Sequence, residues 1–208
     1  MTVEDNLATM SDTRATERPA TARTSERGAA TRGALLDAAR EIFITSGFAE
    51  AGVTDVVQRA GASVGSLYHH FSGKADLYLA LFEDFQTRQT HRTKQAVQQA
   101  RLSGEPDPMP LFLAGARAYL DGCLAERDLA ALFLRGDGPP GFEVIMRDRL
   151  RQWARRNATL FENEDALVVV ITGALAAVVQ ELTLSDDLEA ASRMAEEALL
   201  IISRIRPH

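Results

Sequence analysis

Apolar side chains recur at three- and four-residue spacing along most of the chain, a pattern that predicts amphipathic helices rather than strands. Clusters of glycine and proline interrupt this pattern, and the strongest breaks lie at residues 102–110 and 136–141. We therefore predict an all-α fold of about nine helices. Their expected spans are 31–46, 55–60, 64–71, 74–101, 108–126, 128–134, 142–161, 164–183 and 186–204.

The first 30 residues differ from the rest of the chain in composition. They are mainly Thr, Ala, Ser, Arg and Glu, with almost no large apolar side chain. Such a segment cannot bury enough surface to offset its ordering entropy, so we expect a disordered tail over residues 1–30. The stretch from Arg14 to Arg32 is locally basic, and the alternative is an arm that touches DNA.

A domain boundary is expected inside the long helix over residues 74–101. Its first half has a strong apolar stripe that ends at Phe85, whereas residues 86–99 are mostly polar. The first half should therefore pack with the upstream helices and the second half with the downstream ones. We assign residues 31–80 to one domain and residues 81–208 to a second.

Composition and charge narrow the class of protein. The chain is 46% hydrophobic and 25% charged, which is typical of soluble globular proteins. A net charge of −6 argues mildly against a nucleic-acid partner, but the acidic excess lies in residues 103–208 and residues 1–102 are balanced. The single cysteine, Cys123, excludes an intrachain disulfide and fits a reducing compartment. No secretory signal is recognisable, so we expect a cytoplasmic protein.

The stretch over residues 166–179 is apolar on nearly all sides, and a membrane span is the first alternative to test. Its length corresponds to about 21 Å of helix, against a hydrocarbon core of about 30 Å. We therefore predict a fully buried helix and no membrane association. The helices over 164–183 and 186–204 carry more apolar surface than one small domain needs, which predicts a homodimer through them. The alternative is that both simply fill the core of a monomer.

The segment from Thr54 to Lys74 has the shape of a helix-turn-helix. Thr54 is expected to cap a first short helix, and Gly61 to end it in a left-handed conformation. Ser63 can cap a second short helix over residues 64–71, which has little apolar bulk. Several of its groups can reach phosphates or base edges, namely those of Ser63, Ser66, Tyr68, His69 and His70.

Residues 31–82 resemble the DNA-binding domain of the TetR family of bacterial transcriptional regulators. The resemblance implies an all-α homodimeric repressor whose C-terminal domain binds a small molecule and dimerises. It rests on features that occur in the expected order and spacing: Leu-Leu-Asp-Ala-Ala-Arg-Glu-Ile-Phe over residues 35–43, Gly47-Phe48, Val53-Thr54, Arg59-Ala60-Gly61, the stretch Val-Gly-Ser-Leu-Tyr-His-His-Phe over residues 64–71, Lys74 and Leu77.

The resemblance also implies roles for individual residues. Thr54 and Tyr68 would contact phosphates, and Lys74 would hold a phosphate at the start of the next helix. The complete expected DNA-binding set is Thr54, Ser63, Val64, Gly65, Ser66, Tyr68, His69, His70 and Lys74. No Arg or Lys lies between Gly61 and Gly73, so arginine cannot read guanine from this helix. Specificity must come from small polar contacts, the histidines, thymine methyl groups, DNA shape or the arm.

Aromatic and adaptable side chains of the middle helices are the candidates for a pocket that takes an apolar or amphipathic inducer. Trp153 and Tyr119 each have a polar end that a ligand could use. The alternative for each of these residues is ordinary core packing. The expected ligand-binding set is Phe85, Phe112, Tyr119, Phe133, Met146, Trp153 and Phe161.

The sequence carries no recognisable enzyme or metal signature, such as a nucleophile elbow, a GxxxxGK loop or paired carboxylates. His69 and His70 are adjacent on a helix and point about 100° apart, so they cannot share one ion well. We expect no catalytic residue, cofactor or metal, and we interpret Cys123 as an inert core thiol.

The expected function is a ligand-responsive homodimeric repressor that binds a near-palindromic operator in double-stranded DNA and is released by a small molecule. The alternative is a helical small-molecule-binding or interaction protein without specific DNA binding.

Overall fold

The computed structural model describes residues 20–161 and 164–205. Over these residues it contains nine helices and no strand, which confirms the all-α prediction. The helices are α1 (Ala20–Glu50), α2 (Val53–Arg59), α3 (Val64–His70), α4 (Lys74–Leu102), α5 (Pro108–Ala125), α6 (Arg127–Leu134), α7 (Phe142–Ala158), α8 (Asp165–Leu184) and α9 (Leu188–Ser203).

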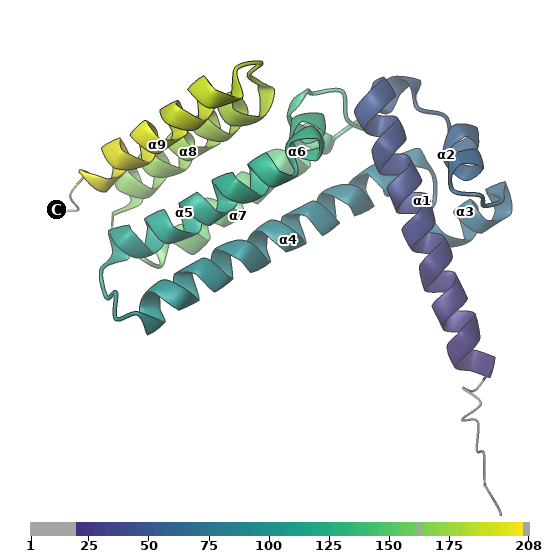
Figure 1. Cartoon of the computed structure of the whole chain (residues 1–208), viewed down its shortest axis with the longest axis horizontal. Coiled ribbons are helices and arrows are strands. Elements are labelled where there is room, and N and C mark those ends of the chain that lie inside the picture. Colours follow the sequence, from purple (N-terminus) through teal and green to yellow (C-terminus); the bar gives the residue numbers. More distant parts are fainter. Residues whose placement is uncertain (1–19, 162–163, 206–208) are drawn as a thin grey trace, which may run out of the picture.

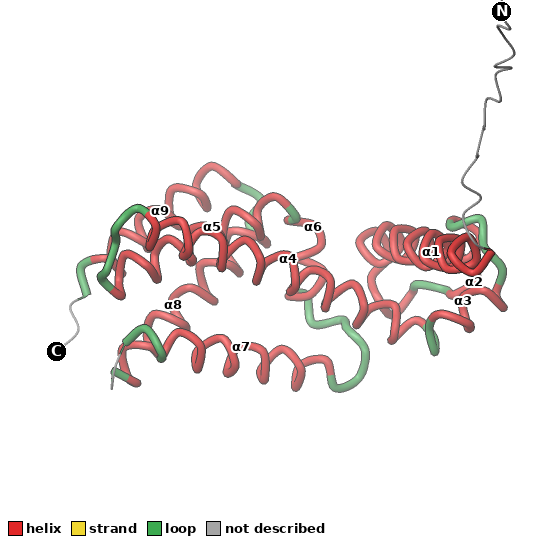
Figure 2. The backbone as a smooth tube through the Cα atoms, turned by 90° about the horizontal axis from the view of Figure 1, so that it is seen from below, coloured by secondary structure: helices red, strands yellow, loops and turns green. Residues whose placement is uncertain are grey.

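Helix α4 is the long element that links two groups of helices. Figure 1 shows α1, α2 and α3 gathered at one end of α4, whereas α5 to α9 lie along and beyond the rest of it. Figure 2 shows the same two groups from below. We call the group formed by α5 to α9 and the adjoining part of α4 the second bundle; within it, α7 and α8 lie on the opposite side from α4, α5 and α9. Helix α4 packs on α1 near its beginning and on α5 along most of its remaining length.

Helix α1 begins at Ala20, so the predicted limit of a disordered tail at residue 30 is wrong for residues 20–30. The prediction was based only on the lack of large apolar side chains that could be buried. They follow Pro19 and are rich in alanine and arginine, which favour helix, and they extend a helix already nucleated where Leu35 packs. Residues 1–19, the rest of the predicted tail, lie outside the described residues.

Helix α8 is not fully buried, contrary to the prediction. Half of its most apolar stretch is buried against α5, α6, α7 and α9, but Val169 is 68% exposed and Val170 is 58% exposed. The helix is long and apolar enough by composition to cross a membrane, a test that core helices also pass. The sequence could not divide this helix into two faces because both faces are apolar.

Candidate nucleic-acid interface

The turn between α2 and α3 is fixed by backbone hydrogen bonds. Gly61 has φ of 60°, as the glycine stop predicted, and its N–H donates to the Gln58 carbonyl at 3.2 Å. The N–H of Ala62 donates to the Val57 carbonyl at 2.9 Å. This pair of bonds is the Schellman motif, which turns the chain sharply after a helix and satisfies its last carbonyls. The angle at which α3 leaves α2 is therefore set by the backbone.

The beginning of α2 differs from the prediction. Gly52, with φ of −95° and ψ of 144°, is the cap residue, and the helix starts at Val53. Thr54 is therefore an exposed residue of the first turn and not its cap. The sequence favoured Thr54 because threonine is a good cap, but Gly52 takes the extended conformation that lets the chain enter the helix earlier.

Helix α3 begins as predicted, with Ser63 as its cap. The Ser63 hydroxyl oxygen accepts the Ser66 N–H at 3.0 Å and lies 2.9 Å from the Ser66 hydroxyl. Leu67 and Phe71 point into the core. The other residues of the expected DNA-binding set on α3 lie on its outer side, where Tyr68 is 57% exposed. The helix is thus anchored by two apolar residues and presents an outer face of mostly polar side chains that contains no lysine or arginine.

Lys74, which the resemblance assigned to a phosphate, is engaged inside the protein. Its ammonium donates to the carbonyls of Phe48, Ala49 and Ala51 at 3.0, 2.9 and 3.2 Å, and lies 4.7 Å from the centre of the Phe48 ring. An ammonium has three N–H groups, so all are used. Phe48 and Ala49 belong to the last residues of α1, beyond a kink at Gly47, and we call this kink and the residues up to Ala51 the turn at Phe48. In the free protein Lys74 fastens the start of α4 to this turn.

Asp137, in the loop between α6 and α7, holds the same turn from the other side. Its Oδ2 accepts the Phe48 N–H at 3.1 Å, and Gly47 presses so closely that a Cβ there would lie 2.5 Å from this oxygen. Arg135 donates to the Ile44 carbonyl at 3.4 Å. Sequence reasoning missed these contacts because they join residues about ninety positions apart. The turn at Phe48 is therefore held by the second bundle as well as by α4.

Seven rings surround this junction, and we call them the proximal aromatic cluster. Tyr78 packs edge-on against Phe43, Phe48, Phe133 and Phe142 at 5.0–5.6 Å, and its hydroxyl donates to the Leu132 carbonyl at 3.2 Å. Burial and the nearby Asp137 raise the pKa of Tyr78 well above its usual value, so it stays a neutral donor. The cluster consists of Phe43, Phe48, Tyr78, Phe82, Phe85, Phe133 and Phe142.

A second group of rings, the distal aromatic cluster, lies further along the second bundle. Phe112 lies 6.0 Å from both Trp153 and Phe161, and Tyr119 stacks on Trp153 at 6.5 Å. The expected ligand-binding residues are therefore divided. Phe112, Tyr119, Trp153 and Phe161 form this cluster, Phe85 and Phe133 belong to the proximal one, and Met146 packs on the core as a half-buried side chain.

Cys123 is buried near the distal aromatic cluster. Burial raises the pKa of its thiol to about 12, although the neighbouring Tyr119 hydroxyl opposes this shift. At neutral pH the group is a thiol and not the reactive thiolate, which agrees with the interpretation as an inert core residue. Among the residues that the structure describes, no group of His, Cys, Asp and Glu side chains has the arrangement of a metal site.

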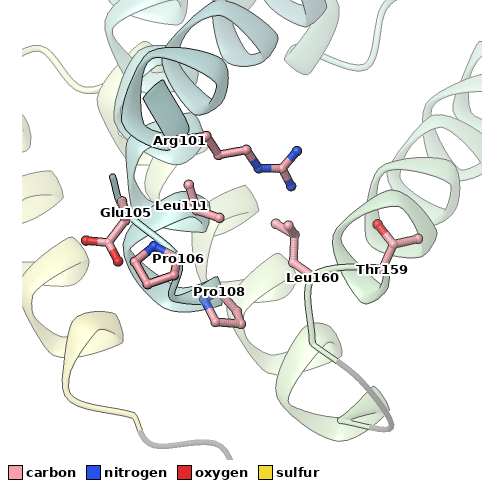
Figure 3. Close-up of a pocket in the computed structure, with 7 residues that line it drawn as sticks. All are labelled: Arg101, Glu105, Pro106, Pro108, Leu111, Thr159 and Leu160. Carbon is pink, nitrogen blue, oxygen red and sulfur yellow. The ribbon is translucent and has the colours of Figure 1, made fainter. Parts of the chain in front are cut away.

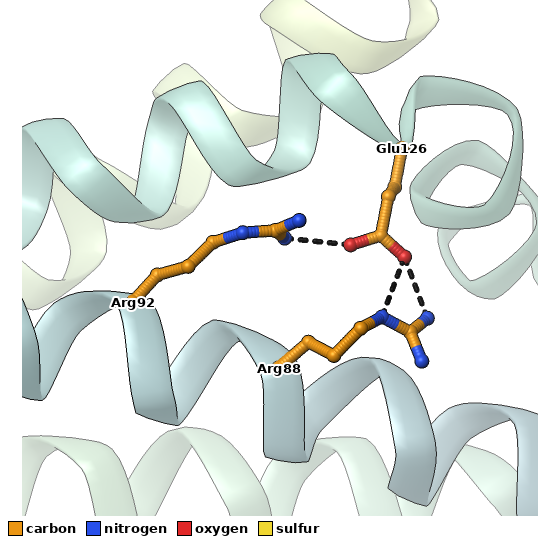
Figure 4. Close-up of polar contacts among 3 residues, drawn as sticks. All are labelled: Arg88, Arg92 and Glu126. Atoms are coloured by element: carbon orange, nitrogen blue, oxygen red, sulfur yellow. Dashed lines mark hydrogen bonds and ion pairs between the residues drawn. The ribbon is translucent and has the colours of Figure 1, made fainter.

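A carboxylate joins α4 to the end of α5. Glu126 accepts from Arg88 at 2.5 and 2.9 Å and from Arg92 at 2.6 Å (Figure 4). Burial alone would raise the pKa of Glu126, but the two guanidinium groups outweigh it and hold the pKa below its usual value. The carboxylate is charged at neutral pH and ties two consecutive turns of α4 to the same point.

Comparison with known proteins agrees with this arrangement. The family model described as "Bacterial regulatory proteins, tetR family" matches residues 35–81, the segment from the buried part of α1 to the first half of α4. Residues 35–81 therefore carry the TetR-family segment. The matched segment contains α2, α3 and the turn at Phe48 that Lys74 and Asp137 hold.

Curated relatives match this chain over part of their length. The chain is 38% identical over 90 residues to the transcriptional activator FasR of Mycolicibacterium smegmatis, which covers 43% of this chain and 39% of FasR. It is 30% identical over 144 residues to the transcriptional regulator AcuR of Cereibacter sphaeroides, which covers 64% of this chain and 61% of AcuR. The alignments with these first relatives thus cover less than two thirds of either protein.

Solved structures support the whole fold. A TetR-family regulator from Syntrophomonas wolfei superposes with a TM-score of 0.67 and 19% identity, over 83% of this chain and 92% of that chain. A transcriptional regulator from Aquifex aeolicus gives 0.63 and 19% identity, over 83% and 99%. At this level of identity the likeness concerns the fold alone.

Proposed function

We propose that this protein is a sequence-specific DNA-binding transcriptional regulator that acts as a homodimer and is controlled by a small molecule. The observation that carries the proposal is the outer face of α3. Its residues project from a helix whose start is capped by Ser63 and whose inner side is anchored by Leu67 and Phe71. A face that is rigid, exposed, polar and small suits close approach to a major groove.

The chemistry of this face suggests how DNA is read. No described residue of α3 is a lysine or arginine, so hydroxyl and imidazole groups, with Val64 and Gly65 near the bases, supply direct contacts. Thr54 and Tyr68 are exposed and free to meet phosphates. Specificity then rests on small polar contacts, thymine methyl groups and the shape of the DNA rather than on arginine–guanine pairs.

The exposed apolar face of α8 and α9 supports a homodimer. Val169 and Val170 on α8 and Leu200 and Ile201 on α9 are all more than half exposed, and Gly173 and Ala177 on the same outer side of α8 allow close approach of a second helix. A symmetric contact through these helices would cover the apolar surface. It would place two copies of α3 on successive major grooves, about 34–36 Å apart, on a near-palindromic operator.

The second bundle is the place where we propose that a small molecule acts. Gln89 on α4 is 1% exposed, and neither its Oε1 nor its Nε2 has a hydrogen-bond partner among the described residues. Buried orphan polar atoms are costly, and a ligand that satisfies them gains affinity. Movement of α4 would reach the DNA-binding end through Lys74 and the turn at Phe48. A tenfold change in DNA affinity requires about 1.4 kcal/mol of differential binding between the two states.

A gel-shift experiment tests DNA binding directly. DNA from upstream of the protein's own gene and neighbouring promoters would be used at about 0.15 M salt with nonspecific competitor, since salt sets the nonspecific background. Gly65→Glu should abolish the specific complex, because a Cβ at this position meets only the Ser63 hydroxyl, at 3.8 Å, and the carboxylate beyond it would face the DNA. Gly33→Glu is the matched control: it adds the same charge at an open glycine of α1 and should leave the complex intact.

The same assay decides between this function and the alternative of a helical small-molecule-binding protein without specific DNA binding. Absence of a specific complex with every promoter tested would favour the alternative. We propose repression relieved by ligand as the direction of control, and a reporter gene behind the operator measures it. Because the relative FasR is named an activator, a fall in reporter expression on deleting the gene would reverse the proposed direction.

Sedimentation at micromolar concentration tests the dimer. Ile201→Glu should convert a dimer to a monomer, because it puts a charge into the proposed interface. Leu102→Glu is the control, since Leu102 is also an exposed apolar residue, 75% exposed, but lies at the end of α4. A monomeric parent protein would remove the dimer from the proposal.

A further inference from the structure

A pocket of about 360 Å³ opens at the end of the second bundle that is far from α3. It lies between the end of α4, the loop that follows it, the start of α5 and the end of α7. Figure 3 shows Leu111 and Leu160 facing each other across it, with Pro106 and Pro108 along one side. The walls thus combine leucine and proline side chains with Arg101, Glu105 and Thr159, and the size suits a small amphipathic molecule.

One positive charge stands at this pocket. In Figure 3 the Arg101 guanidinium extends over the opening toward Leu160, and it forms no ion pair with any described residue. The acidic residue of the lining, Glu105, points away from Arg101 in the same view, and its Oε1 accepts the Asp107 N–H at 3.0 Å. The polar side of the pocket therefore offers a donor fork that pairs with no described acidic residue, which suits a carboxylate.

The apolar side of the pocket adjoins the distal aromatic cluster along the chain. Leu111 and Leu160 are the chain neighbours of Phe112 and Phe161, whose rings lie 6.0 Å apart. On α7, Asn157 follows Trp153 by four residues and so shares its face, and the Asn157 Nδ2 is buried with no partner among the described residues. Next to this side of the pocket there is thus a set of rings, two of them partly buried, together with one donor that has no partner among the described residues.

We propose that this pocket is the mouth of a binding site for an amphipathic carboxylate. The carboxylate binds Arg101, and the apolar tail passes between Leu111 and Leu160 toward Trp153. This inference deepens the proposed function, because it names the chemical class of the effector. It rests on the proposed response to a small molecule but not on DNA binding.

The only tryptophan of the chain, Trp153, provides the measurement. Decanoate, kept below its micelle concentration, would be titrated into the full-length protein without DNA while the tryptophan emission is followed, and decanol would serve as the uncharged probe of the same length. We expect a saturable change with both probes and an apparent affinity about tenfold higher for decanoate, because only decanoate can pair with a guanidinium. Equal affinities, or no saturable change, would overturn the proposal.

Two variants locate the carboxylate. Arg101→Gln should remove the preference for decanoate and leave decanol binding unchanged, which also reports that the variant is folded. Arg193→Gln is the control, since Arg193 is an exposed arginine of α9 that pairs with Glu189; it should keep the preference. A preference that survives Arg101→Gln would contradict the assignment. A failed gel shift with normal decanoate binding would instead count against the DNA-binding function alone.

Discussion

The two aromatic clusters of this protein are similar in composition but differ in how they are held. The proximal cluster has seven rings, all buried. The Tyr78 hydroxyl ties it to the backbone of α6, and Asp137 accepts the backbone N–H of Phe48. The distal cluster has four rings, of which Tyr119 and Trp153 are only partly buried, and lies beside an open pocket. The first therefore joins the two bundles through fully buried rings, and the second is the one that would adapt to the proposed ligand.

This difference separates two tasks that the proposed function requires. A ligand needs side chains that can move without large cost, whereas transmission to α3 needs side chains that cannot move independently. Tyr78 and Phe82 on α4 contact rings from α1, α6 and α7, so a displacement of α4 cannot leave the turn at Phe48 unchanged. The comparison predicts that substitutions in the proximal cluster affect stability and DNA binding together.

The largest expected effect comes from removing a proximal ring. Phe82→Ala should lower the free energy of unfolding by about 3–5 kcal/mol, because the ring is fully buried between Phe133 and Phe142. Trp153→Ala in the distal cluster should cost less, about 1–3 kcal/mol, because the site is partly exposed. Urea denaturation followed by circular dichroism measures both. Equal losses would show that the two clusters are equally rigid and would remove the distinction.

A single glycine at the joint gives the next largest effect. Gly47 has φ of 77° and ψ of 171°, a conformation that is almost restricted to glycine, and a Cβ there would lie 2.5 Å from the Asp137 Oδ2. Gly47→Ala should therefore cost about 1–3 kcal/mol of stability.

Gly33→Ala is the matched control for this prediction. Gly33 lies inside α1 with no atom near its missing Cβ, so alanine there should be neutral or stabilise by up to about 1 kcal/mol. Thermal unfolding of both variants decides the matter. If Gly47→Ala unfolded at the parent's temperature, the turn would not be a fixed element of the joint.

The elements of this fold could be predicted from the sequence because they depend on local signals. The glycine stop at Gly61, the cap at Ser63 and the proline-rich break after α4 each act within a few residues. The wrong predictions arose where two local signals compete, as at Gly52 and Thr54, or where a segment is apolar on all sides, as in α8. The predicted start of α1 was wrong because residues 20–30 were judged by their lack of buried side chains, whereas their helix propensity decides their structure.

The candidate site was less predictable because its contacts are distant in the chain. The sequence identified the outer residues of α3, whose spacing on a short helix is enough to place them together. It could not show that Asp137 holds the Phe48 N–H, since no local pattern links a loop acid to a turn about ninety residues earlier. Nor could it divide the expected ligand-binding aromatics into two clusters, because hydrophobic periodicity gives the face of a helix and not its neighbour.

Lys74 is where the family resemblance and the geometry give different expectations. Because its three N–H groups bind carbonyls of the turn, Lys74→Met should lower the free energy of unfolding by about 1–2 kcal/mol. The salt dependence of DNA binding should stay that of the parent protein. Fluorescence anisotropy over a range of salt concentrations measures it. A slope of log K against log salt that is shallower by about 0.9 would restore a phosphate contact to Lys74.

The smallest expected effect concerns the ion pairs that join Glu126, at the end of α5, to α4. The pKa of Glu126 is held below its usual value of 4.5, so the unfolded protein takes up a proton at a higher pH than the folded one does. Its contribution is therefore complete above that usual value and is lost as the pH falls through the lowered one. Glu126→Gln should cost about 1 kcal/mol or less near pH 7 and should reduce the loss of stability in this acidic range. Glu189→Gln, at an exposed pair on α9, is the control and should leave the acid profile unchanged. If Glu126→Gln also left this profile unchanged, the ion pairs of Figure 4 would not contribute to holding α4 against the end of α5.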